Sequence, residues 1–275
     1  FDVAELSLGS YVARRSRGET GLVAIPVFPH RRFRHGYAFV SGRSGISDAA
    51  GFGGTAVGVR NWQTTAGIWL RGILSEHHGL DLAGVRWVAQ DGEDVPLDLP
   101  PSISLERAGP GKRVTDMCAA GEIAGLIYPE LPRQVRANDG SIRRLFTDPK
   151  QAEQQYFART RIFPIMHVVA IRQQVLDKHP WAALNLLEAF ERAKSRAMQR
   201  LEDPRTVSLA WLRALQEEER AILGDDPWQY GAGDVNATAL RTFTGYAVAQ
   251  GVAVRDLPVS DLFDASTLET PPAYV

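Results

Sequence analysis

The chain has 275 residues, a formal net charge of −1 and a sequence pI near 6.7, so no overall field favours nucleic acid or an anionic membrane surface. Hydrophobic residues make up 44% of it, and no apolar run approaches the roughly 20 residues of a membrane helix. Its single cysteine, Cys118, excludes an internal disulfide and is expected to be buried in the core. These features predict a globular protein of one or two domains, with no nucleic-acid partner and no membrane insertion.

The N-terminal residues predict a strand that leads directly into a helix. Residues 1–6 are strand-like, and Ser7 or Ser10 can cap the helix that follows. The strand is already under way at Phe1, as if preceding residues were missing. Because ligands of open α/β sheets bind beyond the carboxyl ends of strands, we expect Ser7 and Ser10 to contact a ligand, with capping alone as the alternative.

Residues 30–35 carry a dense cluster of positive charge. They include three arginines and two histidines, and a guanidinium binds a carboxylate through paired, charge-assisted hydrogen bonds. If the stretch is extended, Arg32 and Arg34 share one side and Arg31 faces the other, so the three cannot all face one ligand. The pattern indicates either a carboxylate site or a solvated loop.

The next unit is a strand, a polar turn and a helix. Residues 55–60 predict the strand, 61–65 the turn and 66–78 the helix, which ends at Gly79. The free N–H groups at a helix N-terminus bind anions, and polar side chains of the turn can add donors, although capping explains the threonines equally well. The candidate donors are Arg60, Asn61, Thr64 and Thr65.

Three later apolar runs, residues 85–89, 124–128 and 162–171, predict further strands. His167 lies inside the last of them. There it can be a hydrogen-bonded core residue or, because histidine titrates near neutral pH, a proton carrier. No spacing of side chains predicts a metal site, and no motif predicts a cofactor.

The C-terminal part of the chain is predicted to be helical. One helix begins near Pro180, where the apolar residues show helical spacing. Two more are expected over residues 206–223 and 236–250, the last with Asn236 as its cap.

Strands that alternate with helices place the chain in the α/β class, with mostly parallel sheet. The strand-rich middle, residues 45–145, is expected to form one lobe. Residues 1–44 and 146–275 are expected to form the other, so that the chain crosses between the lobes twice.

Several stretches, taken together, resemble the 4,5-dihydroxyphthalate decarboxylases, a family similar in fold to type II periplasmic solute-binding proteins. These stretches are residues 1–7, 25–29, 33–35, 57–66, 69–72, 119–123 and 162–167. The resemblance runs from residue 1 to about residue 200. It implies two doubly wound lobes with the ligand in a central cleft, and it implies that an N-terminal part of the first lobe is missing.

The resemblance also implies an activity, the decarboxylation of 4,5-dihydroxyphthalate to protocatechuate and carbon dioxide by ring protonation, without a cofactor. We assign proton transfer to His167 or His35. Substrate binding is assigned to Ser7, Ser10, Arg34, Arg60, Asn61, Thr64 and Thr65. Within the charged cluster, Arg34 and His35 are favoured because they lie in a stretch that resembles the family.

The alternative is a non-catalytic solute-binding protein that delivers a small organic acid to a transporter, because fold alone does not decide function. The enzyme is expected in the cytoplasm and the binding protein in the periplasm. In either case the expected partner is a small acid, aromatic for the enzyme, and the chain could form a homo-oligomer.

Overall fold

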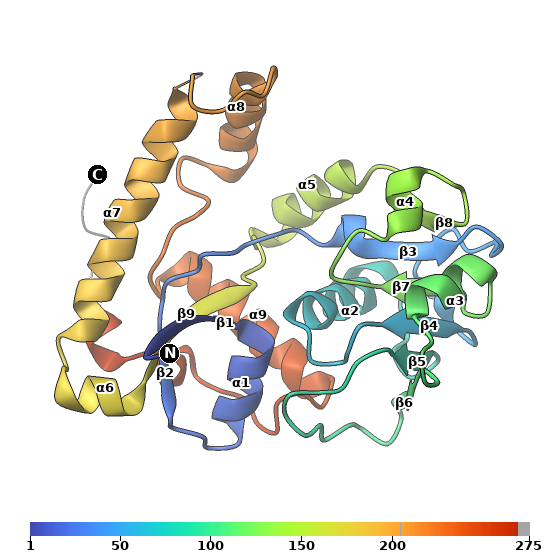
Figure 1. Cartoon of the computed structure of the whole chain (residues 1–275), viewed down its shortest axis with the longest axis horizontal. Helices are drawn as coiled ribbons and strands as arrows, with labels where there is room; N and C mark the ends of the chain where they lie inside the picture. Colours follow the sequence, from blue (N-terminus) through green and yellow to red (C-terminus); the bar gives the residue numbers. More distant parts are fainter. Residues whose placement is uncertain (204, 269–275) are drawn as a thin grey trace.

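The computed structural model describes residues 1–203 and 205–268, whose strands form two separate sheets (Figure 1). Residue 204 and residues 269–275 of the predicted first lobe lie outside the described residues. The smaller sheet consists, in spatial order, of β1 (Val3–Ser7), β9 (His167–Arg172) and β2 (Leu22–Ile25). Strand β9 runs antiparallel to both neighbours. The prediction of mostly parallel sheet is wrong here, because β9 returns from the other lobe and runs back between β1 and β2.

The larger sheet has the order β6-β5-β4-β7-β3-β8. Its strands are β3 (Ala38–Ser41), β4 (Ala56–Val59), β5 (Arg86–Ala89), β6 (Ser104–Arg107), β7 (Gly125–Ile127) and β8 (Ile142–Arg144). The first four strands in this order are parallel, as predicted, whereas β3 is antiparallel to β7 and to β8. The pairing of β3 places it with the second lobe, although residues 1–44 were assigned to the first.

Helices surround both sheets, and α2 joins them. The helices are α1 (Leu8–Ser16), α2 (Thr65–His78), α3 (Val114–Ala120), α4 (Arg133–Ala137), α5 (Pro149–Thr160), α6 (Gln173–Lys178), α7 (Ala182–Glu202), α8 (Leu212–Leu223) and α9 (Asp234–Ala249). Helix α2 contacts α1, α9 and strand β7, whereas α8 and the C-terminal part of α7 extend away from the sheets as a pair (Figure 1). None of the described helices is long and apolar enough to cross a membrane.

Two extended segments connect the lobes and lie side by side. We call residues 26–34 the first crossover and residues 161–166 the second. The backbone N–H of Arg32 donates to the Pro164 carbonyl at 3.0 Å, and the N–H of Met166 donates to the His30 carbonyl at 2.9 Å. These hydrogen bonds hold the two crossovers against each other.

One hydrophobic core extends through both lobes and includes the fully buried Trp62, Trp69 and Trp87. The Trp69 indole N–H donates to the Ile165 carbonyl at 2.8 Å, which ties α2 to the second crossover. A smaller cluster around α3 contains Cys118. Burial raises the pKa of the Cys118 thiol to about 12, and its predicted place in the core is confirmed.

Several predicted elements differ in extent from the observed ones, and three of these differences have a visible local cause or consequence. Strand β9 begins only at residue 167 of the predicted run 162–171, since Pro164 has no N–H for a sheet. Helix α8 covers only the second part of the predicted helix 206–223. Helix α9 is capped by Gly233, and Asn236 lies in its first turn with its amide bonded to the carbonyl oxygens of the preceding loop.

Candidate functional site

Three element ends meet between the two sheets: the end of β1, the start of α2 and the start of β9. Ser7 lies opposite His167 in the β1–β9 register, and its hydroxyl lies 2.8 Å from the Thr65 hydroxyl. The Thr65 hydroxyl also accepts a hydrogen bond from the Gly9 backbone N–H at 2.9 Å. Residues predicted from three distant stretches are thus neighbours, and we call this place, marked by Ser7, Thr65 and His167, the interlobe seam.

Gly9 allows the start of α1 to approach the turn before α2. A Cβ atom at Gly9 would lie 2.4 Å from the Gln63 carbonyl oxygen and 3.3 Å from the Thr65 backbone nitrogen. Carbon and oxygen atoms in close-packed interiors stay well over 3 Å apart, at about 3.5 Å. A side chain at this position would therefore push the two helix starts apart.

His167 is the partly exposed imidazole of the seam. Its Nδ1 lies 2.5 Å from Oε1 of the Glu5 carboxylate, and because a carboxylate only accepts, this hydrogen bond requires a proton on Nδ1. The His30 ring stands edge-on against it, with 4.9 Å between the ring centroids and 86° between the planes. The pKa of His30 is lowered to about 4, mainly by burial and to a smaller extent by the nearby His167 and Arg34. His30 is therefore neutral at pH 7.

Glu5 and His30 are absent from the predicted site. A partial signal existed for Glu5, which lies two positions before Ser7 and therefore on the same face of the strand. For His30 the signal was its place in the charged cluster. The local sequence pattern does not show that β1 pairs with β9, and this pairing brings Glu5 to His167.

Arg34 lies in the first crossover, with 5% of its surface exposed. Its Nη1 donates to the Pro129 carbonyl at 3.2 Å, and its Nε and Nη2 contact the Met166 sulfur at 3.2 and 3.0 Å. Burial lowers the pKa of Arg34 to about 10, so it stays charged at pH 7. None of these partners is a carboxylate, and an anion placed nearby would stabilise this buried cation.

Arg60 follows β4 and is bound to carboxylates of the same lobe. Its Nε donates to Asp91 at 3.2 Å and its Nη1 donates to Glu130 at 2.5 Å. Anchoring a ligand would require one of these pairs to open. The predicted role of Arg60 therefore gains no support from its position.

The turn before α2 is closed by the protein's own side chains. The two oxygens of the Glu93 carboxylate accept from the backbone N–H groups of Trp62 and Gln63 at 2.7 and 2.9 Å. The side-chain oxygen of Asn61 accepts from the Thr64 N–H at 3.0 Å. Asn61 and Thr64 thus serve the turn itself, and an internal carboxylate occupies N–H groups that were predicted to bind a ligand.

The fully buried Arg71 supports the same turn from within. Its Nη2 donates to the Trp62 carbonyl at 2.6 Å, and its Nε donates to Oε1 of Gln250 at 2.8 Å. The guanidinium carbon lies 3.7 Å from the Trp62 ring centroid. This side chain therefore holds the start of α2 against the end of α9.

Ser10 and His35 are engaged elsewhere. The Ser10 hydroxyl donates to Asp94 at 3.3 Å. His35 is fully buried, with ring centroids 5.3 Å from Phe146 and 5.6 Å from His78. Burial, followed by His78, lowers the pKa of His35 to about 3. A neutral ring without access to solvent cannot exchange a proton with a ligand, so the predicted catalytic role of His35 is not retained.

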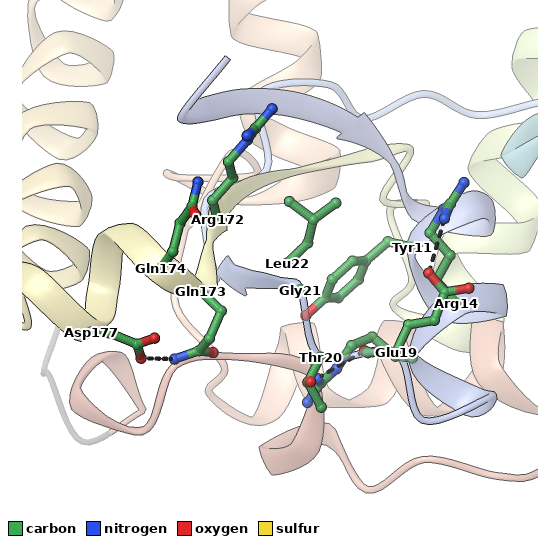
Figure 2. Close-up of a pocket in the computed structure, with 11 residues that line it drawn as sticks. Tyr11, Arg14, Glu19, Thr20, Gly21, Leu22, Arg172, Gln173, Gln174 and Asp177 are labelled. Carbon is green, nitrogen blue, oxygen red and sulfur yellow. Dashed lines mark hydrogen bonds and ion pairs between the residues drawn. The ribbon is translucent and has the colours of Figure 1, made fainter.

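A cavity of about 560 Å³ lies at the opposite end of β9 from the seam, beside Arg172 (Figure 2). Within its lining, Arg14 donates to Glu19 at 2.9 Å and Gln173 donates to Asp177 at 2.8 Å. None of the predicted site residues lines this cavity. Among the described residues, no group of three or more histidine, cysteine, aspartate or glutamate side chains is placed to hold a metal ion.

Comparison with known proteins gives two close relatives in sequence, although no protein-family model matches the chain. Over 278 aligned residues the chain is 34% identical to the 4,5-dihydroxyphthalate decarboxylase of Comamonas testosteroni. This alignment covers 98% of this chain and 84% of that protein. Over 163 residues the chain is 33% identical to the 4,5-dihydroxyphthalate decarboxylase of Pseudomonas putida. That alignment covers 57% of this chain and 63% of that protein.

Solved structures share the fold at low sequence identity. The periplasmic aliphatic sulphonate-binding protein SsuA of Escherichia coli matches with a TM-score of 0.56 and 11% identity, over 96% of this chain and 75% of that one. The sulfonate-binding protein SsuA of Methylobacillus flagellatus matches with the same TM-score and identity, over 96% of this chain and 72% of that one. The α/β fold of type II periplasmic binding proteins is thereby confirmed.

Proposed function

The chain belongs to the 4,5-dihydroxyphthalate decarboxylase family, and from this membership we propose that it converts 4,5-dihydroxyphthalate to protocatechuate and carbon dioxide. The observation that carries the proposal is the 34% identity that extends over 98% of the chain. The proposal is supported by a partly exposed imidazole and a buried arginine that lie on adjoining segments, the arginine with no carboxylate among its hydrogen-bond partners.

The chemistry requires a proton donor and an anchor for the carboxylates. In 4,5-dihydroxyphthalate each carboxylate is para to a hydroxyl, which donates electrons to the ring carbon that carries the carboxylate. That carbon takes a proton, its bond to the carboxylate breaks, the electron pair restores the aromatic ring, and carbon dioxide leaves. We assign the proton to Nε2 of His167 in its doubly protonated form, which gives up the Nε2 proton while Nδ1–H stays bound to Glu5. Solvent then returns a proton to the imidazole.

For substrate binding we assign the anchor to Arg34, whose buried charge would be balanced by a substrate carboxylate. The hydroxyls of Ser7 and Thr65 lie together at the start of α2, where the helix dipole favours negative charge. Arg60, Asn61 and Thr64 are less suited, because each is bound within its own lobe.

The test is to incubate the purified chain with 4,5-dihydroxyphthalate and to measure carbon dioxide and protocatechuate in equal amounts. The second candidate is a binding protein for a small organic acid, favoured by the fold shared with sulfonate-binding proteins. Saturable binding of the acid without product would support this second candidate and exclude the decarboxylase.

A further inference from the structure

A carboxylate outside the predicted site contacts the proposed proton donor. Glu5 lies on β1 and His167 at the start of β9, and the antiparallel register places Glu5 opposite Val169 and Ser7 opposite His167. Glu5 and His167 are therefore diagonal neighbours on one face, within reach of long side chains. The Glu5 carboxylate accepts a hydrogen bond from Nδ1 of His167 at 2.5 Å.

We propose that Glu5 is a positioning residue that holds His167 with Nδ1 protonated and bound, so that Nε2 is the nitrogen that takes up a proton from solvent and delivers it to the substrate. The bond an imidazole makes through one nitrogen decides the role of the other. The His30 ring, which stands edge-on at 4.9 Å, confines the imidazole from a second direction. Together the two contacts fix both the tautomer and the plane of the ring. This inference rests on the proposed decarboxylase function.

The competing explanation is an ordinary surface ion pair. The side chains of Glu5 and His167 are 51% and 35% exposed, and pairs of this exposure contribute about 0–1 kcal/mol to stability. A surface pair would change neither the tautomer of the imidazole nor the rate of the reaction. The two explanations therefore differ in measurements other than thermal stability.

The chain offers a matched control. Glu106 on β6 is also 51% exposed and pairs with Arg86, in the larger sheet. Both Glu5→Ala and Glu106→Ala remove one exposed strand carboxylate from one ion pair. We expect both variants to fold and to melt within a few degrees of the unaltered protein.

The first measurement is the ¹H–¹⁵N correlation spectrum of the imidazole nitrogens above neutral pH, with the His167 signals assigned by their loss in His167→Ala. The unaltered protein and Glu106→Ala are expected to show His167 protonated at Nδ1. Glu5→Ala is expected to shift the proton toward Nε2. An unchanged His167 tautomer in Glu5→Ala would overturn the proposal.

The second measurement is steady-state turnover. Glu5→Ala is expected to lower kcat by roughly 10²-fold, the lower end of what a well-placed acid contributes, with little change in KM. Equal kcat values for Glu5→Ala and Glu106→Ala would also overturn the proposal. If the unaltered protein releases no carbon dioxide, the decarboxylase function fails, and the tautomer alone decides whether Glu5 positions His167.

Discussion

At the residue scale, we propose different side chains for substrate binding and for proton transfer. Arg34 lies on the first crossover and has a buried charge, whereas His167 follows the second crossover and presents one nitrogen. Met166 joins them, since its sulfur contacts the Arg34 guanidinium and its neighbour is His167. A change at His167 should therefore alter kcat, and a change at Arg34 should alter KM.

Replacing His167 by alanine is expected to lower kcat by roughly 10²–10⁴-fold while KM changes little, because the variant loses the acid but keeps the carboxylate anchor. Steady-state turnover with 4,5-dihydroxyphthalate measures both constants. The matched control is His179→Ala, which removes an exposed imidazole just after α6 and should leave both constants unchanged. Full turnover in His167→Ala would exclude this residue as the acid.

Some of the site could be predicted from residue type and position along an element. Ser7 and Thr65 lie at the end of a strand and the start of a helix, and the fold places such ends together. His167 was a candidate by residue type alone, because the pattern placed it inside a strand that in fact begins at this residue. The partners of these residues could not be predicted, because Glu5 reaches His167 only through a strand pairing between residues more than 160 positions apart. The same limit applies to Glu93, which binds backbone N–H groups of a turn 30 and 31 positions earlier in the chain.

At the element scale, the seam depends on how closely α1 approaches the turn before α2. Gly9→Ala is expected to lower the free energy of unfolding by about 1–3 kcal/mol, because the added carbon would collide with the Gln63 carbonyl oxygen. Urea unfolding measures this loss. Since the collision also displaces Thr65, we expect KM to rise.

Gly21→Ala is the control for this substitution, because a Cβ atom there would meet nothing within 4 Å. Its effect on the free energy of unfolding should stay within roughly 0.5 kcal/mol. Equal stability of Gly9→Ala and the unaltered protein would show that the two helix starts can separate without loss.

A second element-scale property is the packing of α2 against α5 around His35. The pKa of His35 is about 3 in the folded protein, chiefly because of burial, and about 6.5 in an unfolded chain. Between these two pH values the unfolded chain binds more protons than the folded protein. The free energy of unfolding that His35 contributes above pH 6.5 is therefore lost as the pH falls. His78, whose pKa burial also lowers, adds to the effect.

We expect His35→Leu to reduce the dependence of stability on pH between 6.5 and 4 by up to about 1.4 kcal/mol for each pH unit, since the leucine cannot take up a proton. Urea unfolding at several pH values measures the slope. His179→Leu should keep the slope of the unaltered protein, because that imidazole is exposed. Identical slopes for all three proteins would contradict the argument.

At the scale of the whole molecule, a buried charge holds the two crossovers that connect the lobes. Arg31 in the first crossover has 4% of its surface exposed. Its Nη1 donates to the Phe163 carbonyl of the second crossover at 3.2 Å. Its Nη2 donates to the Gln229 carbonyl at 2.7 Å and to the Asn236 side chain at 2.6 Å. One side chain thus ties both crossovers to the start of α9.

In the first crossover, neighbouring side chains point in opposite directions, as expected for an extended segment. Arg31 and Arg32 are adjacent but differ in burial. The Arg31 side chain is buried and donates to carbonyl oxygens, whereas the Arg32 side chain is exposed and donates to the Tyr37 hydroxyl at 2.8 Å. The sequence predicts that the two differ in direction. Which of them is buried depends on the position of α9, a contact across about 200 residues that no local pattern contains.

Arg31→Ala is expected to lower the free energy of unfolding by roughly 2–5 kcal/mol, because it leaves buried acceptors on three segments without a donor. Calorimetry should then show the lobes unfolding in separate steps, since the crossovers are no longer held to α9. Arg32→Ala removes the same charge from the next residue and should stay within about 1 kcal/mol of the unaltered protein, with a single transition. If both variants unfold alike, the lobes are held together by apolar packing alone and the buried guanidinium has no part in their coupling.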